Sequence, residues 1–351
     1  MNKKVLLGMS GGVDSSVSAI ILQKQGYEVI GCTMILLENK ESVKQTIQDA
    51  KKVCDKLNIE HYVFDFSKEF KELIIGDFIN EYINARTPNP CVICNKYFKF
   101  GLLYDKAKEL GCKYIATGHY AKIEYSEKYH QNILTKSSEI KKDQTYFLYK
   151  IQKEQLDQII FPLQDFKSKD DIRKIAEEND LEVAKKKDSQ EICFIQDNDY
   201  QKFLKENIKE KIPKGKVVLE DGKVLGNHNG LINYTIGQRK GLGIAYKEPI
   251  YVLGLDKEKN EIVVGSEKSL YSTKLELQDV NWLIPNVFEN ELECFVKIRY
   301  RAKEAKAKVV KVNEKYIVEF EEPQRAITKG QSAVFYDELG NLLGGGIILV
   351  I

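Results

Sequence analysis

Apolar and polar positions follow two different periods along the first 120 residues. Short apolar runs predict β-strands, and stretches with apolar residues every three or four positions predict amphipathic helices. The predicted strands cover residues 5–7, 28–34, 59–66 and 113–117, and the predicted helices begin at 13, 42, 70 and 98. Alternation of this kind is typical of βαβ units. We therefore predict an α/β fold with a parallel sheet and helices on both faces.

Beyond about residue 205 the pattern changes to short alternating stretches between glycine and proline turns. The stretches predict β-strands over residues 250–255, 261–264, 294–300, 306–312 and 316–320. Such spacing is typical of small β-rich modules. We predict an α/β domain over residues 1–206, a central β-rich module over residues 207–274 and a C-terminal β-barrel over residues 275–351.

A glycine- and serine-rich run, Ser10-Gly11-Gly12-Val13-Asp14-Ser15-Ser16, joins the first predicted strand to the first predicted helix. The two glycines allow a tight turn that brings backbone N–H groups near an anion, and a helix N-terminus attracts negative charge. The run has neither the lysine of GxxxxGK[ST] nor the spacing of GxGxxG, so a P-loop kinase and a dinucleotide fold are not indicated. The run predicts a phosphate-binding loop at the carboxyl end of a strand.

Composition places the chain among folded proteins with two or three domains. It has 351 residues, of which 43% are hydrophobic and 30% charged. The net charge is only +2, so a nucleic-acid surface would have to be local, as at residues 299–308 with five basic residues and one acidic. Because no apolar run approaches the roughly 20 residues that span a bilayer, and no signal peptide is evident, we expect a cytoplasmic protein without a membrane partner.

The cysteines are odd in number, which favours reduced thiols over a disulfide framework. They are Cys32, Cys54, Cys91, Cys94, Cys112, Cys193 and Cys294. Prolines and asparagines in Arg86–Lys96 predict a loop that exposes Cys91 and Cys94, and a following helix and Lys96 are expected to lower the pKa of the Cys94 thiol. A CxxC pair also suits half of a zinc site, but the chain has no second CxxC.

The neighbours of Cys193 in the sequence support two different environments for its thiol. Ile192 and Phe194 favour a buried thiol, whereas the polar residues 188–191 favour a strand end or loop. The other cysteines, Cys32, Cys54, Cys112 and Cys294, lie in apolar periodic segments and are predicted to be structural.

Eight motifs follow one another over essentially the whole chain: SGGVDSS, RTPNPCVICNKYFKF, ATGHYAK, KKDQTYFLY, DSQEICFI, YTIGQRKGLG, KIRYRA and GQSAVFY. This series resembles the tRNA-specific 2-thiouridylases, the MnmA family of N-type ATP pyrophosphatases. The resemblance implies an adenine nucleotide alpha hydrolase-like, PP-loop domain that uses ATP and Mg²⁺. It also implies 2-thiolation of the wobble uridine in tRNAs of the Lys, Glu and Gln type, by adenylation of the C2 oxygen and transfer of sulfur.

The resemblance assigns roles residue by residue. It implies ATP binding by Gly8, Met9, Ser10, Gly11, Gly12, Val13, Asp14, Ser15, Met34 and Gly118. It implies contacts with the target base by Asn89, Pro90 and Cys91, and with tRNA by His119, Lys142, Asp143, Gln144, Arg299, Tyr300 and Gln331. It makes Cys94 the nucleophile and Cys193 the persulfide carrier, the two being able to form a disulfide through a movable segment from Asp180 to Cys193.

One departure from the family pattern leaves the sulfur chemistry open. Cys91 stands where the best-known members carry an aspartate, so three cysteines converge on one site. A persulfide on Cys193 would come from a sulfur-relay protein or a cysteine desulfurase. Alternatively, Cys91, Cys94 and Cys193 would hold a [4Fe-4S] cluster that takes up free sulfide.

Two other functions remain open from the sequence. The first is another PP-loop ATP pyrophosphatase, either a thiolase for a different tRNA base or an amidotransferase-type ligase. The second is a non-catalytic tRNA-binding or metal-storage protein that has kept the fold.

Overall fold

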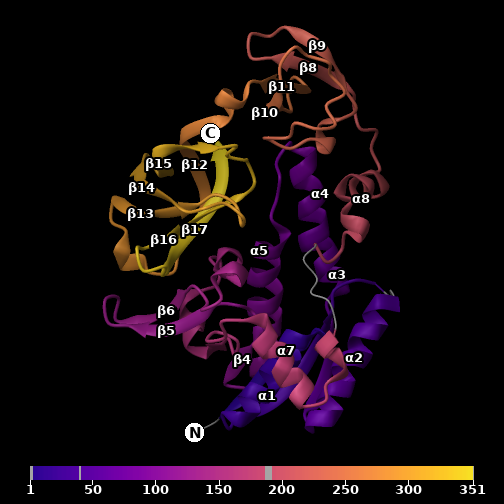
Figure 1. Cartoon of the computed structure of the whole chain (residues 1–351), viewed down its shortest axis with the longest axis vertical. Coiled ribbons are helices and arrows are strands. Elements are labelled where there is room, and N and C mark those ends of the chain that lie inside the picture. Colours follow the sequence, from indigo (N-terminus) through magenta and orange to yellow (C-terminus); the bar gives the residue numbers. More distant parts are fainter. Residues whose placement is uncertain (1–2, 39–40, 186–191, 351) are drawn as a thin grey trace. The chain divides into compact units, whose positions relative to one another are not determined.

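The computed structural model describes residues 3–38, 41–185 and 192–350 (Figure 1). The chain divides into two compact units. The first unit contains Met1–Ile74, Cys91–Gln190 and Leu339–Leu342, and the second contains Ile75–Pro90, Glu191–Glu338 and Leu343–Ile351. Within the described residues, no helix has the length and apolar character needed to cross a bilayer.

A five-stranded parallel sheet forms the centre of the first unit, as predicted. Its order is β3-β2-β1-β4-β7, with β1 at Lys4–Gly8, β2 at Glu28–Ile35, β3 at Glu60–Asp65, β4 at Tyr114–Ala116 and β7 at Ile159–Ile160. Successive side chains of a strand point to opposite faces, and Val5, Leu6 and Leu7 are all fully buried. Both faces of β1 are therefore covered.

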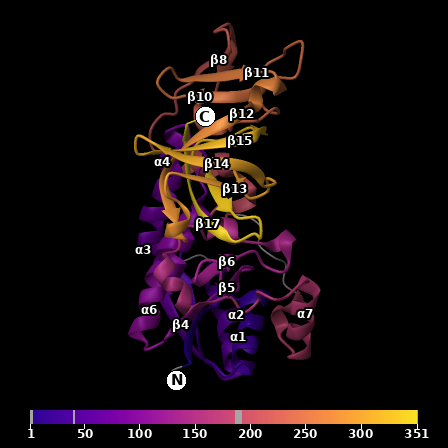
Figure 2. The same cartoon turned by 90° about the vertical axis from the view of Figure 1, so that its left-hand side faces the viewer.

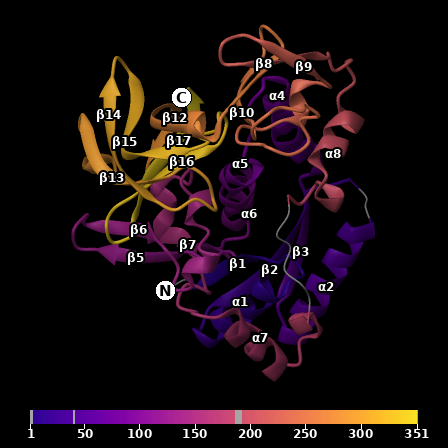
Figure 3. The same ribbon diagram turned by 45° about the horizontal axis from the view of Figure 1, so that its top comes forward.

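Helices cover the two faces of this sheet. The helices α1 (Val13–Lys24), α2 (Glu41–Leu57) and α7 (Lys169–Glu178) pack with Val5 and Leu7 on one face (Figure 3). On the other face, Leu103 of α6 (Leu103–Glu109) lies near Gly8. A β-hairpin, β5 (Lys122–Ser126) with β6 (Gln131–Thr135), also belongs to this unit. The predicted α/β fold is confirmed.

Two predicted helices are interrupted by wider π-helical turns. The first consists of α3 (Ser67–Phe70), a π-helix at Lys71–Ile75 and α4 (Gly76–Ile83). The second begins as a π-helix at Asn95–Leu102 and continues as α6. Phe98 and Phe100 of the second π-helix are both buried, and Phe98 packs edge-on against Phe70.

The predicted loop around the CxxC pair is shorter than expected. The structure places Pro90–Cys94 in a helix, α5, which leads directly into the π-helix. Proline suits the first helical turn because its missing N–H has no helical partner there. The sequence rule that two prolines mark a loop was therefore wrong for residues 90–94.

The second unit holds the helices α4 and α8 (Tyr200–Asn207) and two β-structures. A four-stranded sheet has the order β10-β11-β8-β9, from β8 (Gly215–Leu219), β9 (Val224–His228), β10 (Tyr251–Asp256) and β11 (Glu261–Gly265). A closed barrel has the order β12-β15-β14-β13-β16-β17, from β12 (Tyr271–Trp282), β13 (Glu291–Lys297), β14 (Ala305–Val312), β15 (Lys315–Arg325), β16 (Ser332–Tyr336) and β17 (Leu342–Val350) (Figure 2). The predicted C-terminal barrel is confirmed. The division by residue number into three domains stays a prediction.

Candidate functional site

The glycine-rich loop lies between β1 and α1. Gly11 has a φ of +63°, and a Cβ there would lie 2.8 Å from the Thr46 carbonyl oxygen of α2. The Ser15 and Ser16 hydroxyls donate to the Gly12 carbonyl at 3.1 and 2.9 Å. No side chain caps the first turn of α1 in the described structure. The loop therefore presents helix N–H donors at the carboxyl end of β1.

Asp14 stands in the first turn of α1 and has two partners. The Tyr120 hydroxyl donates to Asp14 Oδ1 at 2.8 Å, and Lys169 Nζ lies 2.6 Å from the same oxygen. A Cβ on Gly118 would lie 3.2 Å from Asp14 Cβ and from the Ser15 N atom. The structure thus brings Gly118, in the turn after β4, against the loop after β1.

Two predicted nucleotide contacts have different environments. Met9 is buried; its N–H donates to the Cys32 carbonyl at 2.6 Å, and its carbonyl accepts from Thr33 Oγ1 at 2.9 Å. Met9 therefore supports the loop from the sheet side. Met34 is half-buried near the end of β2, next to β1.

His119 is buried between a hydroxyl and an ammonium group. Its Nδ1 lies 2.6 Å from Thr117 Oγ1, and its Nε2 lies 3.3 Å from Lys99 Nζ. An ammonium only donates, so Nε2 accepts and Nδ1 carries the proton. Burial holds the pKa of His119 well below its usual 6.5, and the positive charge of Lys99 lowers this pKa further, as the smaller of the two causes.

The buried neutral His119 makes stability depend on pH. Between its folded pKa and 6.5, the unfolded chain binds a proton that the folded chain does not, so the free energy of unfolding rises with pH. When the pH falls from 7 to 5, we expect His119 to lower the free energy of unfolding by up to about 2 kcal/mol. Urea unfolding of wild type and His119→Asn at both pH values measures this difference. Equal losses in the two proteins would contradict this account.

Cys91 and Cys94 lie at positions i and i+3 of α5, on one side of that helix. Cys91 is exposed and Cys94 half-buried. Burial raises the pKa of Cys94 to about 11, and Lys99 opposes this rise. The predicted lowering of this pKa was wrong, because Cys94 lies inside a helix that begins at Pro90 and Lys96 Nζ lies over the Tyr97 ring.

Cys193 belongs to the second unit and is exposed, whereas its neighbour Phe194 is buried against Phe78 and Phe203. The predicted movable segment from Asp180 to Cys193 includes residues 186–191, which lie outside the described residues.

The cysteines predicted to be structural are buried: Cys32, Cys54, Cys112 and Cys294. Among the described residues, no three His, Cys, Asp or Glu side chains are grouped to hold a metal ion.

The predicted turn at residues 142–144 is tied to the interior of the first unit. Asp143 is buried; its carboxylate accepts from the Ser137 N–H at 3.1 Å and from the Thr145 hydroxyl at 2.6 Å. Gln144 Oε1 accepts from the Tyr120 N–H at 3.0 Å. Lys142 is half-buried. Asp143 therefore stabilises this turn through internal hydrogen bonds, and little of its side chain is exposed for a direct RNA contact.

The segment that leads to α5 is held by a barrel loop of the same unit. Gln331 Nε2 donates to the Thr87 carbonyl at 2.8 Å and to the Pro88 carbonyl at 3.3 Å, and the Thr87 N–H donates to the Lys329 carbonyl at 2.9 Å. Gly330 has a φ of +87° and faces the Thr87 backbone. This contact fixes the backbone just before Asn89 and Pro90.

Arg299 and Tyr300 begin the predicted basic segment at residues 299–308. Arg299 donates to the Ala326 carbonyl and to Thr328 Oγ1, and so orders the start of the loop that carries Gln331. The Tyr300 ring lies 5.6 Å from Lys297 Nζ.

Removing the Gln331 amide is expected to loosen the segment at residues 86–90. Each of its two hydrogen bonds contributes about 0.5–1.5 kcal/mol, so Gln331→Ala should lower the free energy of unfolding by about 1–3 kcal/mol. Hydrogen exchange at the Thr87 amide should quicken. Gln324→Ala is the matched control, because the Gln324 side-chain amide donates within its own strand, to the Glu322 carbonyl. Equal exchange rates in the two variants would refute the assigned role.

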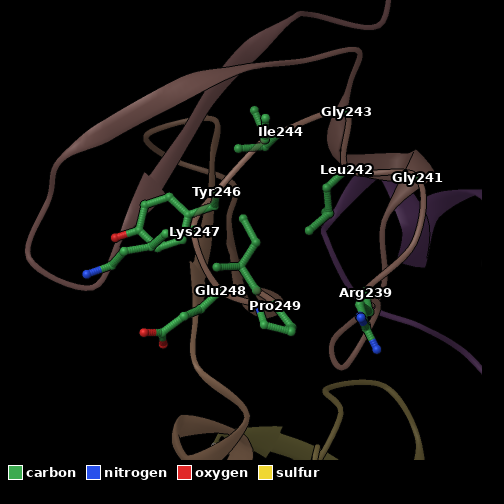
Figure 4. Close-up of a pocket in the computed structure, with 11 residues that line it drawn as sticks. Arg239, Gly241, Leu242, Gly243, Ile244, Tyr246, Lys247, Glu248 and Pro249 are labelled. Carbon is green, nitrogen blue, oxygen red and sulfur yellow. The ribbon is translucent and has the colours of Figure 1, made fainter.

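A pocket of about 650 Å³ lies within the loop that carries the GQRKGLG motif (Figure 4). Figure 4 shows Arg239 and Lys247 on opposite sides of it. Its lining residues, all in the described part of the chain, include no residue predicted for the site.

Comparison with known proteins connects the motifs to one family. Residues 3–197 match the model of a tRNA methyl transferase HUP domain, 201–266 a tRNA methyl transferase PRC-barrel domain and 272–348 an aminomethyltransferase beta-barrel domain. A tRNA-specific 2-thiouridylase MnmA of Clostridioides difficile (strain 630) is 47% identical over 99% of this chain and 98% of its own length. A second one, from Thermoanaerobacter sp. (strain X514), is 48% identical over the same shares. The chain belongs to the MnmA family.

Membership of the MnmA family confirms the resemblance drawn from the eight motifs. A solved structure from Methanocaldococcus jannaschii, a predicted subunit of tRNA methyltransferase, is 23% identical over 50% of this chain and 74% of its own, with a TM-score of 0.33.

Three residues of this MnmA-family chain contact predicted site residues but were not predicted from the sequence. Lys99 lies beside His119, and Tyr120 and Lys169 lie beside Asp14. Tyr120 stands inside the ATGHYAK motif, whereas Lys169 follows only a serine typical of a helix N-cap.

Proposed function

We propose that this chain is an ATP-dependent enzyme that replaces the C2 oxygen of a tRNA wobble uridine with sulfur. One observation supports this most directly: an uncapped, glycine-rich helix N-terminus with Asp14 at its first turn, in a chain whose full-length relatives are named tRNA-specific 2-thiouridylases. The substrate would be tRNA of the Lys, Glu or Gln type.

The first step would activate the uridine. The C2 oxygen attacks the α-phosphate of ATP, pyrophosphate leaves, and the oxygen then departs with AMP. The N–H groups at Gly11, Gly12 and the start of α1 suit the phosphates. The residues also fit Mg²⁺, because Asp14 offers a partly exposed carboxylate in this loop. When bound, Mg²⁺ would neutralise charge on the departing pyrophosphate.

The second step would transfer sulfur through Cys193 and Cys94. The exposed Cys193 suits loading with a persulfide by a sulfur-relay protein or a cysteine desulfurase. The terminal sulfur attacks C2 and AMP leaves. The Cys94 thiolate then attacks the Cys193 sulfur, which releases the 2-thiouridine and forms a Cys94–Cys193 disulfide. A cellular thiol reductant would restore both thiols.

A [4Fe-4S] cluster on Cys91, Cys94 and Cys193 is the competing route for the same reaction. Its support is the i, i+3 placement of two thiols on α5, which suits two ligands of one cluster. When bound, such a cluster would supply an iron atom that takes up sulfide.

The test is thiolation of unmodified tRNA by protein purified under argon. The reaction contains ATP, Mg²⁺ and either sulfide or a persulfide donor, and nucleoside mass spectrometry detects 2-thiouridine at the wobble position. We expect thiolation only with ATP. Release of pyrophosphate without thiolated uridine would contradict the proposal and favour another ATP pyrophosphatase. Iron and labile-sulfide analysis of the same protein distinguishes the cluster from the persulfide.

A further inference from the structure

The phosphate-binding loop contains no basic residue between Gly8 and Ser16. Loops that bind nucleoside triphosphates commonly use a lysine on the β- and γ-phosphates. In this structure a lysine does lie at the loop, but it comes from a distant part of the chain. Lys169 Nζ is 2.6 Å from Asp14 Oδ1, and only 10% of the Lys169 side chain is exposed.

The start of α7 fixes Lys169 at this position. Ser168 caps the helix, because its hydroxyl accepts from the Asp170 N–H at 3.0 Å. Lys169 is the first helical residue, and α7 packs on α1 through Ile172 and Ala176. A helix anchored in the core thus holds the ammonium beside the loop.

Burial of this ammonium is offset by Asp14 and by Tyr120. The Tyr120 ring centroid lies 5.8 Å from Lys169 Nζ, and the Tyr120 hydroxyl shares Asp14 Oδ1 with it. A buried ammonium is costly unless it is paired. Mg²⁺ held by Asp14 would compete with Lys169 for this carboxylate, and the Lys169 ammonium would then pair with another anion within its reach.

We propose that Lys169 is the phosphate-binding lysine of this site and that it contacts the pyrophosphate portion of ATP. It pairs with Asp14 before the nucleotide binds and with the β- and γ-phosphates afterwards. During adenylation it stabilises the charge that passes to the departing pyrophosphate. This inference rests on the proposed use of ATP.

The test compares nucleotide affinities in Lys169→Gln. Isothermal titration with ATP and Mg²⁺, with inorganic pyrophosphate and with AMP gives three dissociation constants. Loss of a charge-assisted contact is expected to weaken ATP and pyrophosphate binding about 10- to 100-fold. AMP binding should change less than about threefold, since AMP has no β- or γ-phosphate.

Four further variants complete the experiment. Lys174→Gln is the matched control, because Lys174 stands on the same helix with 74% of its side chain exposed. Lys169→Arg should recover most of the affinity. If Lys169→Gln unfolds, Asp14→Asn with Lys169→Gln removes the unpaired charge, and pyrophosphate binding should still be lost relative to Asp14→Asn alone.

The outcomes separate this inference from the proposed function. Wild-type affinity for pyrophosphate in Lys169→Gln, or an equal loss for AMP and ATP, would overturn the role of Lys169. Failure of the wild-type protein to bind ATP would instead overturn the proposed function itself.

Discussion

Cys193→Ser is expected to abolish wobble-uridine thiolation while ATP-dependent pyrophosphate release continues. Serine cannot carry a transferable sulfur atom, so the fall should be at least about 1,000-fold. In the proposed mechanism adenylation takes place at the loop in the first unit, whereas Cys193 lies in the second. Single-turnover assays with tRNA, ATP and a persulfide donor, quantifying 2-thiouridine and pyrophosphate separately, measure both activities. Parallel loss of both would show that Cys193 has a role other than sulfur transfer.

Cys91→Ser is the matched variant, because Cys91 is also an exposed thiol. In the persulfide route Cys91 is not a sulfur carrier, so its serine variant should keep at least about a tenth of wild-type thiolation. In the cluster route all three cysteines are ligands, and this variant should lose iron and activity together. The pair of variants therefore decides between the two routes.

Gly11→Val is expected to abolish ATP binding, with a rise in the dissociation constant of at least about 100-fold. Two costs coincide at this position. The φ of +63° costs a residue with a Cβ about 1–2 kcal/mol, and the Cβ would lie 2.8 Å from the Thr46 carbonyl oxygen. The α2 helix and the loop cannot both keep their positions. Isothermal titration with ATP and Mg²⁺ measures the loss.

Gly111→Ala is the control for backbone strain alone. Gly111 has a φ of +69°, but a Cβ there meets no atom within 4 Å. This variant should lose stability and keep ATP affinity within about twofold, since its strain lies away from the loop. An ATP affinity of wild-type strength in Gly11→Val would mean that the phosphates bind elsewhere.

Most of the first sheet could be predicted because each strand is a local apolar run. The strands at residues 28–34 and 113–117 lie within one or two residues of their positions in the structure. The π-helical turns could not be predicted, since their period depends on packing partners such as Phe70 and Phe98 that come from different helices. The same limit explains why a helix replaced the expected loop at Pro90–Cys94.

The candidate site could be predicted where it is contiguous in sequence and not where it is assembled in space. The loop at residues 10–16 was predicted from glycines and serines in one run between an apolar strand and an amphipathic helix. Lys169 is 155 positions from Asp14, so no local pattern links them. The pKa of Cys94 was predicted in the wrong direction because burial, which is a property of the fold, has a larger effect than the nearest lysine in the sequence.

The contact between Gln331 and the segment before α5 has a consequence for how this chain can diverge. Gln331 donates to the main-chain carbonyls of Thr87 and Pro88, so it places no demand on either side chain. At position 87 the contact requires only a main-chain N–H for the Lys329 carbonyl, which proline lacks. Substitution of Gly330 is restricted, because a Cβ there would lie 3.0 Å from the Thr87 main-chain N and O atoms. This contact therefore restricts substitution more tightly at position 330 than at positions 87 and 88.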